Sequence, residues 1–203
     1  MRVRISRRAG MMMVGVVLAG AMAASAGRGD LGLPTWRETL TLLAAALLHE
    51  AGHVAAAWGW SVPVRSLRLD LFGARLELGG LTGYAAELAV AAGGPLVSLV
   101  GAALAYPLGG AEEGAALFSA VSLGLGLLNL LPVAGLDGGR MLACALGLTA
   151  GERAAEITLR VTSAVALGCL WLLSVYALLR IGETLTLFTF SLCLLLRLTD
   201  LQK

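Results

Sequence analysis

Two histidines, four positions apart, are the residues of this chain with the clearest chemical potential: His49-Glu50-Ala51-Gly52-His53. On an α-helix, side chains at positions i and i+4 lie on the same face, so both imidazoles can reach one metal ion. Imidazole nitrogens are common zinc ligands, and a glutamate beside them can take a proton from a zinc-bound water. The motif therefore predicts a hydrolytic zinc site with His49 and His53 as ligands and Glu50 as general base.

The setting of this motif is apolar. Residues 39–48 before it and residues 54–64 after it carry no charged side chain. Ionisable groups inside an apolar membrane segment are costly and usually mark a functional site. The alternative, two ordinary helix histidines that bind no metal, is therefore the less favoured interpretation.

The composition predicts the fold class. Hydrophobic residues make up 58% of the 203 residues and charged residues 14%, a balance typical of membrane proteins. A spanning helix needs about 20 apolar residues. We expect an all-α polytopic membrane protein, a single domain over residues 1–203, with a first span that is retained rather than cleaved as a signal peptide. The six expected transmembrane helices lie near residues 10–27, 38–59, 85–107, 114–132, 158–179 and 182–198.

The positive charges predict the orientation. With the N-terminus in the cytoplasm, twelve of the fifteen lysine and arginine residues fall on the inner side. Both termini are then cytoplasmic, in a bacterial cytoplasmic membrane. Trp36 and Trp58 bracket the second span, which places His53 near its cytoplasmic end. The net charge of +2 and the absence of a long basic tract argue against nucleic acid as a partner; the lipid bilayer is the expected surroundings.

A catalytic zinc usually has three protein ligands and a water. With no further histidine in the chain, the third must be a carboxylate or a thiolate. The three cysteines lie far apart in apolar runs and are expected to be small buried hydrophobes: Cys144, Cys169 and Cys193. Asp137 follows the fourth span at the cytoplasmic side, the depth expected for His53, and is the favoured third ligand. The alternative is an interfacial turn aspartate, which Asp-Gly commonly marks.

The two motifs together, His49-Glu50-x-x-His53 and Asn129-x-x-Pro132-x-x-x-x-Asp137-Gly138, resemble those of the site-2 proteases. These are zinc metalloproteases that cut proteins within or near their transmembrane segments. Gly93-Gly94-Pro95 is similar to a small-residue motif of the same family. The resemblance implies one zinc ion per chain, held by His49, His53 and Asp137, with Glu50 as base. It also implies that Asn129 orients substrate or stabilises the oxyanion; the alternative is a hydrogen bond between helices.

Residues 61–80 have the roughly alternating pattern of a β-hairpin, with Phe72-Gly73 at the turn. The resemblance implies a small membrane-associated sheet here, between the second and third spans. Because a helix hides its peptide bonds, a protease needs extended substrate, and an exposed strand edge can bind it as an added strand. We expect the hairpin to hold the substrate. A surface hairpin without that role is the alternative.

Among site-2 proteases, the chain is most similar to the short bacterial type that processes a membrane-tethered pro-sigma factor. This implies a tethered pro-sigma or anti-sigma factor as substrate and membrane proteins as inhibitors or regulators. We expect neither a PDZ insertion nor a CBS domain. Two other functions remain open: a metal-ion transporter that uses the same His/Asp cluster, and an inactive homologue that binds substrates without cutting. Clustering of the polar groups at one depth argues against transport.

Overall fold

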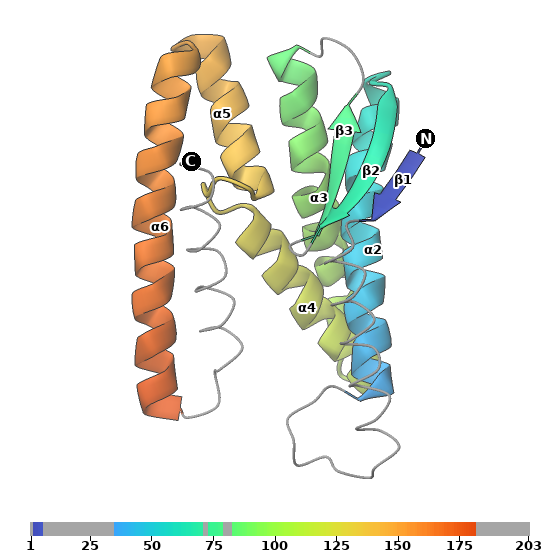
Figure 1. Cartoon of the computed structure of the whole chain (residues 1–203). Helices are drawn as coiled ribbons and strands as arrows, with labels where there is room; N and C mark the ends of the chain where they lie inside the picture. The colour runs from blue at the N-terminus through green and yellow to red at the C-terminus, as the bar shows by residue number, and fades with distance from the viewer. Residues whose placement is uncertain (1, 6–34, 71–72, 79–82, 182–203) are drawn as a thin grey trace. The chain divides into compact units, whose positions relative to one another are not determined.

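The computed structural model describes residues 2–5, 35–70, 73–78 and 83–181. It divides at Asn129 into two compact units, and each is described by itself. The first unit holds a three-stranded sheet and the helices α2, α3 and α4, and the second holds α5 and α6 (Figure 1).

Helix α2 (Trp36–Gly59) is the element that carries both histidines. It begins at a capping box in which the Thr35 hydroxyl accepts from the Glu38 amide, while the Thr35 amide donates to the Glu38 carboxylate. Such reciprocal bonds satisfy two of the amides that a helix start leaves unpaired. The helix then runs for 24 residues, long and apolar enough to cross a membrane.

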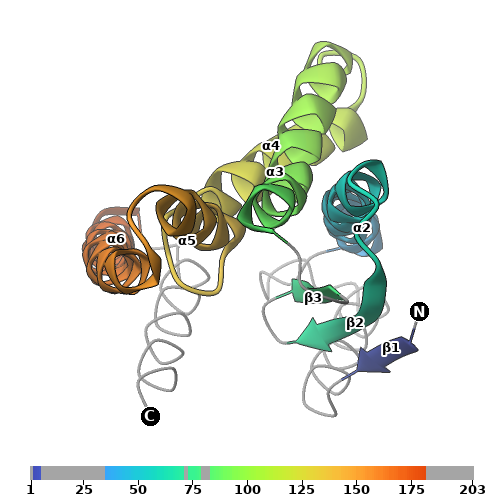
Figure 2. The same ribbon diagram turned by 90° about the horizontal axis from the view of Figure 1, so that it is seen from above.

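Helices α3 (Tyr84–Ala105) and α4 (Glu113–Asn129) complete the helical part of the first unit, joined by the short 3-10 helix η2 (Tyr106–Leu108). Helices α2, α3 and α4 pack against one another (Figures 1 and 2). Helix α4 ends at Asn129, three residues before Pro132, as expected for a residue type that cannot continue a helix.

The contact between α2 and α3 is built from very small residues. A β-carbon added at Gly52 would collide with the Gly93 carbonyl, and one added at Gly93 would meet the Gly52 carbonyl oxygen. Backbones that approach this closely are a general feature of helix pairs in membranes, where small residues line the interface. Large apolar side chains point outward instead, as Leu43, Leu47 and Leu104 do. The α2–α3 register is therefore set by backbone contact.

A sheet in the order β1-β2-β3 accompanies these helices. Strands β2 (Val64–Asp70) and β3 (Gly73–Leu78) pair antiparallel, with Leu67 opposite Leu76, in the segment where a hairpin is expected. Strand β1 (Arg2–Ile5) pairs parallel with β2, which the sequence did not predict. Among the described strands, β2 is thus central, and β1 and β3 each pair on one side only.

The second unit contains a helix that was not expected from the sequence. Asp137, which follows the fourth expected span, is the first residue of this helix, α5 (Asp137–Thr149). Helix α6 (Glu152–Ile181) follows after Gly151, which has a positive φ of 85° that favours glycine. Helix α6 therefore begins six residues earlier than the span expected near residue 158.

Three of the expected spans coincide with helices that could cross a membrane, and these are Trp36–Gly59, Tyr84–Leu108 and Glu152–Tyr176. Helix α4, at the fourth expected span, is apolar but has only 17 residues. The first and last expected spans lie outside the described residues. Among the described residues the chain thus has the helices of an integral membrane protein, while the count of six and the single domain stay predictions.

Candidate metal centre

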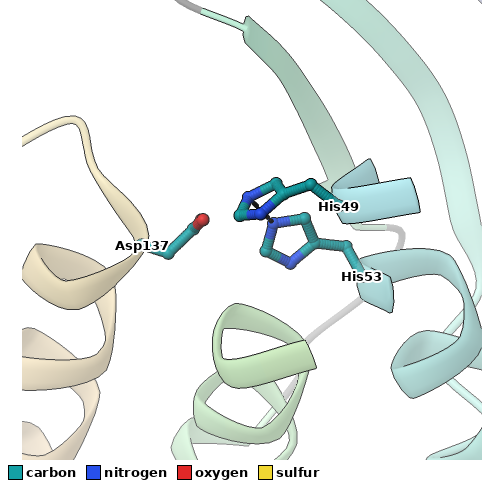
Figure 3. A group of neighbouring side chains, drawn as sticks. All are labelled: His49, His53 and Asp137. Atoms are coloured by element: carbon teal, nitrogen blue, oxygen red, sulfur yellow. Dashed lines mark hydrogen bonds between the residues drawn. The ribbon is translucent and has the colours of Figure 1, made fainter. Parts of the chain in front are cut away.

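His49 and His53 lie on the inner face of α2, each only 4% exposed. Their Nε2 atoms are 3.3 Å apart, and the rings meet edge to face at an interplanar angle of 82° (Figure 3). The i, i+4 spacing therefore brings two imidazole nitrogens together at one point, as the motif predicted.

Helix α3 fixes both rings from the other side. The His53 Nδ1 lies 2.7 Å from the carbonyl oxygen of Val90, which can only accept, so this nitrogen carries the hydrogen. The His49 Nδ1 lies 2.9 Å from the Ser98 hydroxyl, which can accept in the same way. Both Nε2 atoms then present lone pairs, the form in which imidazole binds a metal.

The sequence Gly93-Gly94-Pro95 lies beside the His53 ring. The His53 Nδ1 is 3.3 Å from the Gly94 nitrogen as well as 2.7 Å from the Val90 oxygen. Pro95 lies inside α3 and lacks the amide hydrogen that a regular helix would donate to the Ala91 carbonyl. The glycines admit the imidazole, since a β-carbon at Gly94 would collide with the His53 and His49 rings.

The spacing of the two nitrogens matches a zinc site. Zinc binds imidazole at about 2.0–2.1 Å with tetrahedral angles, which separates two ligand nitrogens by about 3.3 Å. The observed Nε2–Nε2 separation is 3.3 Å. The two rings and their partners on α3 therefore fit a zinc ion without rearrangement.

Glu50 follows His49 on α2 and is half-buried, with its Oε2 atom fully buried. A carboxylate next to the metal-binding face is where a general base is needed, because it must reach a water that the metal also holds. Its role as base stays a prediction.

The two remaining predicted residues lie at helix ends. Asn129 is the last residue of α4, where its Nδ2 donates to the Leu125 carbonyl at 3.0 Å. This bond is within its own helix and differs from the interhelical bond considered as the alternative role. Asp137, half-buried, begins α5 in the second unit. Their roles at the metal stay predictions.

The sequence analysis missed the groups that orient the two histidine rings, which are the Ser98 hydroxyl and the Val90 carbonyl. Ser98 had a signal: it is the hydroxyl in the middle of an otherwise apolar span, and such residues usually make hydrogen bonds between helices. The Val90 carbonyl had no signal in the sequence, because every residue type supplies a backbone carbonyl.

Replacing Ser98 by alanine should weaken zinc binding by roughly 10- to 100-fold, the usual effect of losing a partner that orients a ligand histidine. Zinc affinity of the purified chain, measured by competition with a chromophoric chelator, checks this. Ser119→Ala is the matched control, because Ser119 is also buried but donates to the Ala102 carbonyl elsewhere on α3. Equal affinities for wild type and Ser98→Ala would exclude Ser98 as an orienting residue.

The chain is similar in sequence to proteins that are named as zinc metalloproteases. The model of peptidase family M50 matches residues 110–172. The zinc metalloprotease Rip3 of Mycobacterium tuberculosis is 39% identical over 122 residues, 55% of this chain and 31% of that protein. The zinc metalloprotease sll0528 of Synechocystis is 35% identical over 143 residues, 66% of this chain and 37% of that protein. The chain thus spans about a third of the length of these curated relatives.

The fold is similar to that of a solved protease. The site-2 protease from Methanocaldococcus jannaschii aligns with a TM-score of 0.63 at 19% identity, over 98% of this chain and 89% of that one. At this identity the likeness concerns the fold alone. Taken with the sequence matches, it makes the chain similar in fold to the site-2 proteases and in sequence to the zinc metalloproteases of peptidase family M50.

Proposed function

We propose that this chain is an intramembrane zinc endopeptidase that hydrolyses peptide bonds in or near the transmembrane segments of membrane-tethered proteins. The observation that carries the proposal is the pair of Nε2 atoms, 3.3 Å apart and held by partners on α3 in the form that binds metal. Such a pre-formed pair on an apolar helix is of little use to a membrane protein unless a metal occupies it.

The proposed third ligand is the Asp137 carboxylate. In the proposal it joins His49 and His53, which belong to the first unit, at one metal ion. Two imidazoles and one carboxylate are a common ligand set for hydrolytic zinc, which leaves the fourth position for water. The proposal requires the second unit to present α5 with its first residue at the paired imidazoles.

A zinc ion held by His49, His53 and Asp137 would supply a Lewis acid for the scissile carbonyl and a water of lowered pKa. Glu50 accepts the proton of that water and returns it to the leaving amine. Asn129 uses one amide hydrogen on the Leu125 carbonyl and has a second with which to stabilise the oxyanion. Ser98 and the Val90 carbonyl hold the imidazoles in the required tautomer.

The proposed substrates are single-span proteins whose cleavage releases a regulator, such as a pro-sigma or anti-sigma factor, and membrane proteins would act as inhibitors or regulators. The lysine and arginine distribution supports a chain with both termini in the cytoplasm of a bacterium and a metal centre near the cytoplasmic side. A site at that depth would receive both water and the unwound end of a substrate helix.

We expect metal removal to stop cleavage. Purified chain in lipid nanodiscs should cut a single-span test protein, lose at least about 100-fold of its rate with a zinc chelator, and recover when zinc is restored, since the metal generates the nucleophile. Product size on a gel is the readout. Metal uptake into sealed vesicles without any cleavage would instead support the transporter.

The outer edge of β3 is the proposed binding site for extended substrate, because β3 is the edge strand of the 61–80 hairpin and β2 already pairs with a strand on both sides. Along β3, successive amides point alternately toward β2 and toward the outer edge. Arg75 and Leu76 are neighbours on β3, so one of their amides points toward β2 and the other toward the outer edge. Replacing each by proline, in two separate variants, therefore removes one amide of each orientation.

The proline that removes an outward amide should lower the cleavage rate by roughly 10-fold or more while leaving zinc affinity unchanged, since only a substrate bond is lost. Cleavage rate and zinc content of both variants are the measurements. If neither proline changes cleavage, the edge of β3 does not hold substrate.

A further inference from the structure

The position of Asp137 depends on the residues just before it, because it is the first residue of α5. This ligand loop, residues 130–136, is folded back on itself: the Val133 amide donates to the Leu131 carbonyl at 2.7 Å, and the Leu136 amide to the Val133 carbonyl at 3.0 Å. Val133 and Leu136 are buried. The loop is therefore a compact, ordered element.

The ligand loop also lies directly against the first turn of α5. A β-carbon at Gly138 would collide with the Leu130 carbonyl, and one at Gly139 with the Val133 carbonyl. Because the two glycines let the backbones touch, the loop and the first turn of α5 form one piece. A displacement of the loop must then displace Asp137.

One side chain joins this piece to the long helix α6. The Ala134 amide donates to the Ser163 hydroxyl at 2.8 Å, and that hydroxyl donates to the Leu159 carbonyl at 2.6 Å. Ser163 is fully buried. At membrane depth an amide hydrogen without a partner is costly, so loss of this hydroxyl would force the loop to move or leave Ala134 unpaired.

We propose that Ser163 is a positioning residue for the third metal ligand: it holds the ligand loop against α6 and so sets where the Asp137 carboxylate lies. The inference rests on the proposed function, because it takes Asp137 as a ligand. It assigns to α6 a part in metal binding through a residue that is not itself a metal ligand.

Two substitutions of Ser163 with side chains of equal shape separate the effect of the hydroxyl from that of side-chain volume. Ser163→Thr keeps it, and in a helix the threonine hydroxyl can make the same bond to the carbonyl four residues earlier. Ser163→Val has the same volume and no hydroxyl. Ser174→Ala is the positional control: Ser174 is also fully buried on α6 and donates to the Trp171 carbonyl of its own helix.

The experiment measures zinc affinity of the full chain in nanodiscs by chelator competition, together with the visible absorption of the Co²⁺-loaded protein, which reports the ligand geometry. We expect Ser163→Val to lose roughly 10- to 100-fold in affinity and to shift the Co²⁺ bands. Ser163→Thr and Ser174→Ala should stay within about threefold of wild type. Ser163→Ala provides a second loss variant if the valine disturbs folding.

A double-mutant cycle separates positioning from a general structural effect. In an Asp137→Ala background, Ser163→Val should cause no further loss of affinity, because the ligand it positions is already gone. Equal losses in both backgrounds, or equal affinities of the Thr and Val variants, would overturn the inference while leaving the protease proposal intact. A wild-type chain that binds no zinc would overturn both.

Discussion

Glu50→Gln should reduce peptide hydrolysis by at least about 1,000-fold while the protein keeps its zinc. General bases contribute about 10²–10⁴ to a rate, and here the same carboxylate takes the proton from water and returns it to the leaving amine. A 1,000-fold loss corresponds to about 4 kcal/mol of transition-state stabilisation. Glutamine has the shape of glutamate but cannot accept that proton, so the histidine pair should be undisturbed.

Two measurements on the same preparation check this: the initial rate of cleavage of a single-span substrate, and zinc content by elemental analysis. Glu156→Gln is the control, because Glu156 is an exposed carboxylate on α6 paired with Arg160. It should cut at the wild-type rate. A Glu50→Gln variant that cleaves normally would show that another group is the base, and one that loses zinc would mean that Glu50 supports the ligands.

Gly94→Ala should abolish zinc binding although it adds only one methyl group. A β-carbon at this position would lie 2.6 Å from the His53 Cε1 atom and 2.8 Å from the His49 Nε2 atom, well inside van der Waals contact. The methyl group therefore collides with both rings close to the nitrogens proposed to bind the metal. Since α2 and α3 are already in backbone contact at Gly52 and Gly93, the helices cannot separate to make room without losing that contact.

We expect Gly94→Ala to lower zinc affinity by more than about 100-fold, beyond the usual effect of losing an outer partner, and cleavage should fall with it. The control is Gly124→Ala on α4, where an added β-carbon meets nothing within 4 Å. That change should leave zinc binding intact and slightly stabilise the helix, because alanine has the higher helix propensity. Wild-type affinity in Gly94→Ala would mean that the rings do not lie as described.

The histidine pair could be predicted from the sequence because helix geometry alone dictates it: residues four apart share a face, and the apolar surroundings showed that the face is buried. What holds the rings could not be predicted. The Val90 carbonyl and the Ser98 hydroxyl act across a helix–helix contact, and no periodicity within one helix shows which residues of another lie opposite. Gly94 and Pro95 were noted through a family resemblance, and only the structure gives their physical reason.

Helix α5 was not predicted from the sequence, and the reason is different. It begins Asp137-Gly138-Gly139, and two glycines in a first turn are poor helix formers, so the segment has the pattern of a turn. The glycines are there because the preceding carbonyls lie against them, which is a tertiary contact. Similarly, the arginines near the N-terminus were interpreted as a topology signal, and the pairing of Arg2–Ile5 with β2 depends on a partner some 60 residues away.

X-ray absorption spectroscopy of the zinc-loaded chain in lipid tests the central claim most directly. The account predicts a four-coordinate zinc with two imidazole nitrogens and two oxygens, at about 2.0–2.2 Å. In Asp137→Ala the imidazole scattering should remain while the oxygen shell changes. A spectrum with fewer than two imidazoles, or one that Asp137→Ala leaves unchanged, would contradict the account.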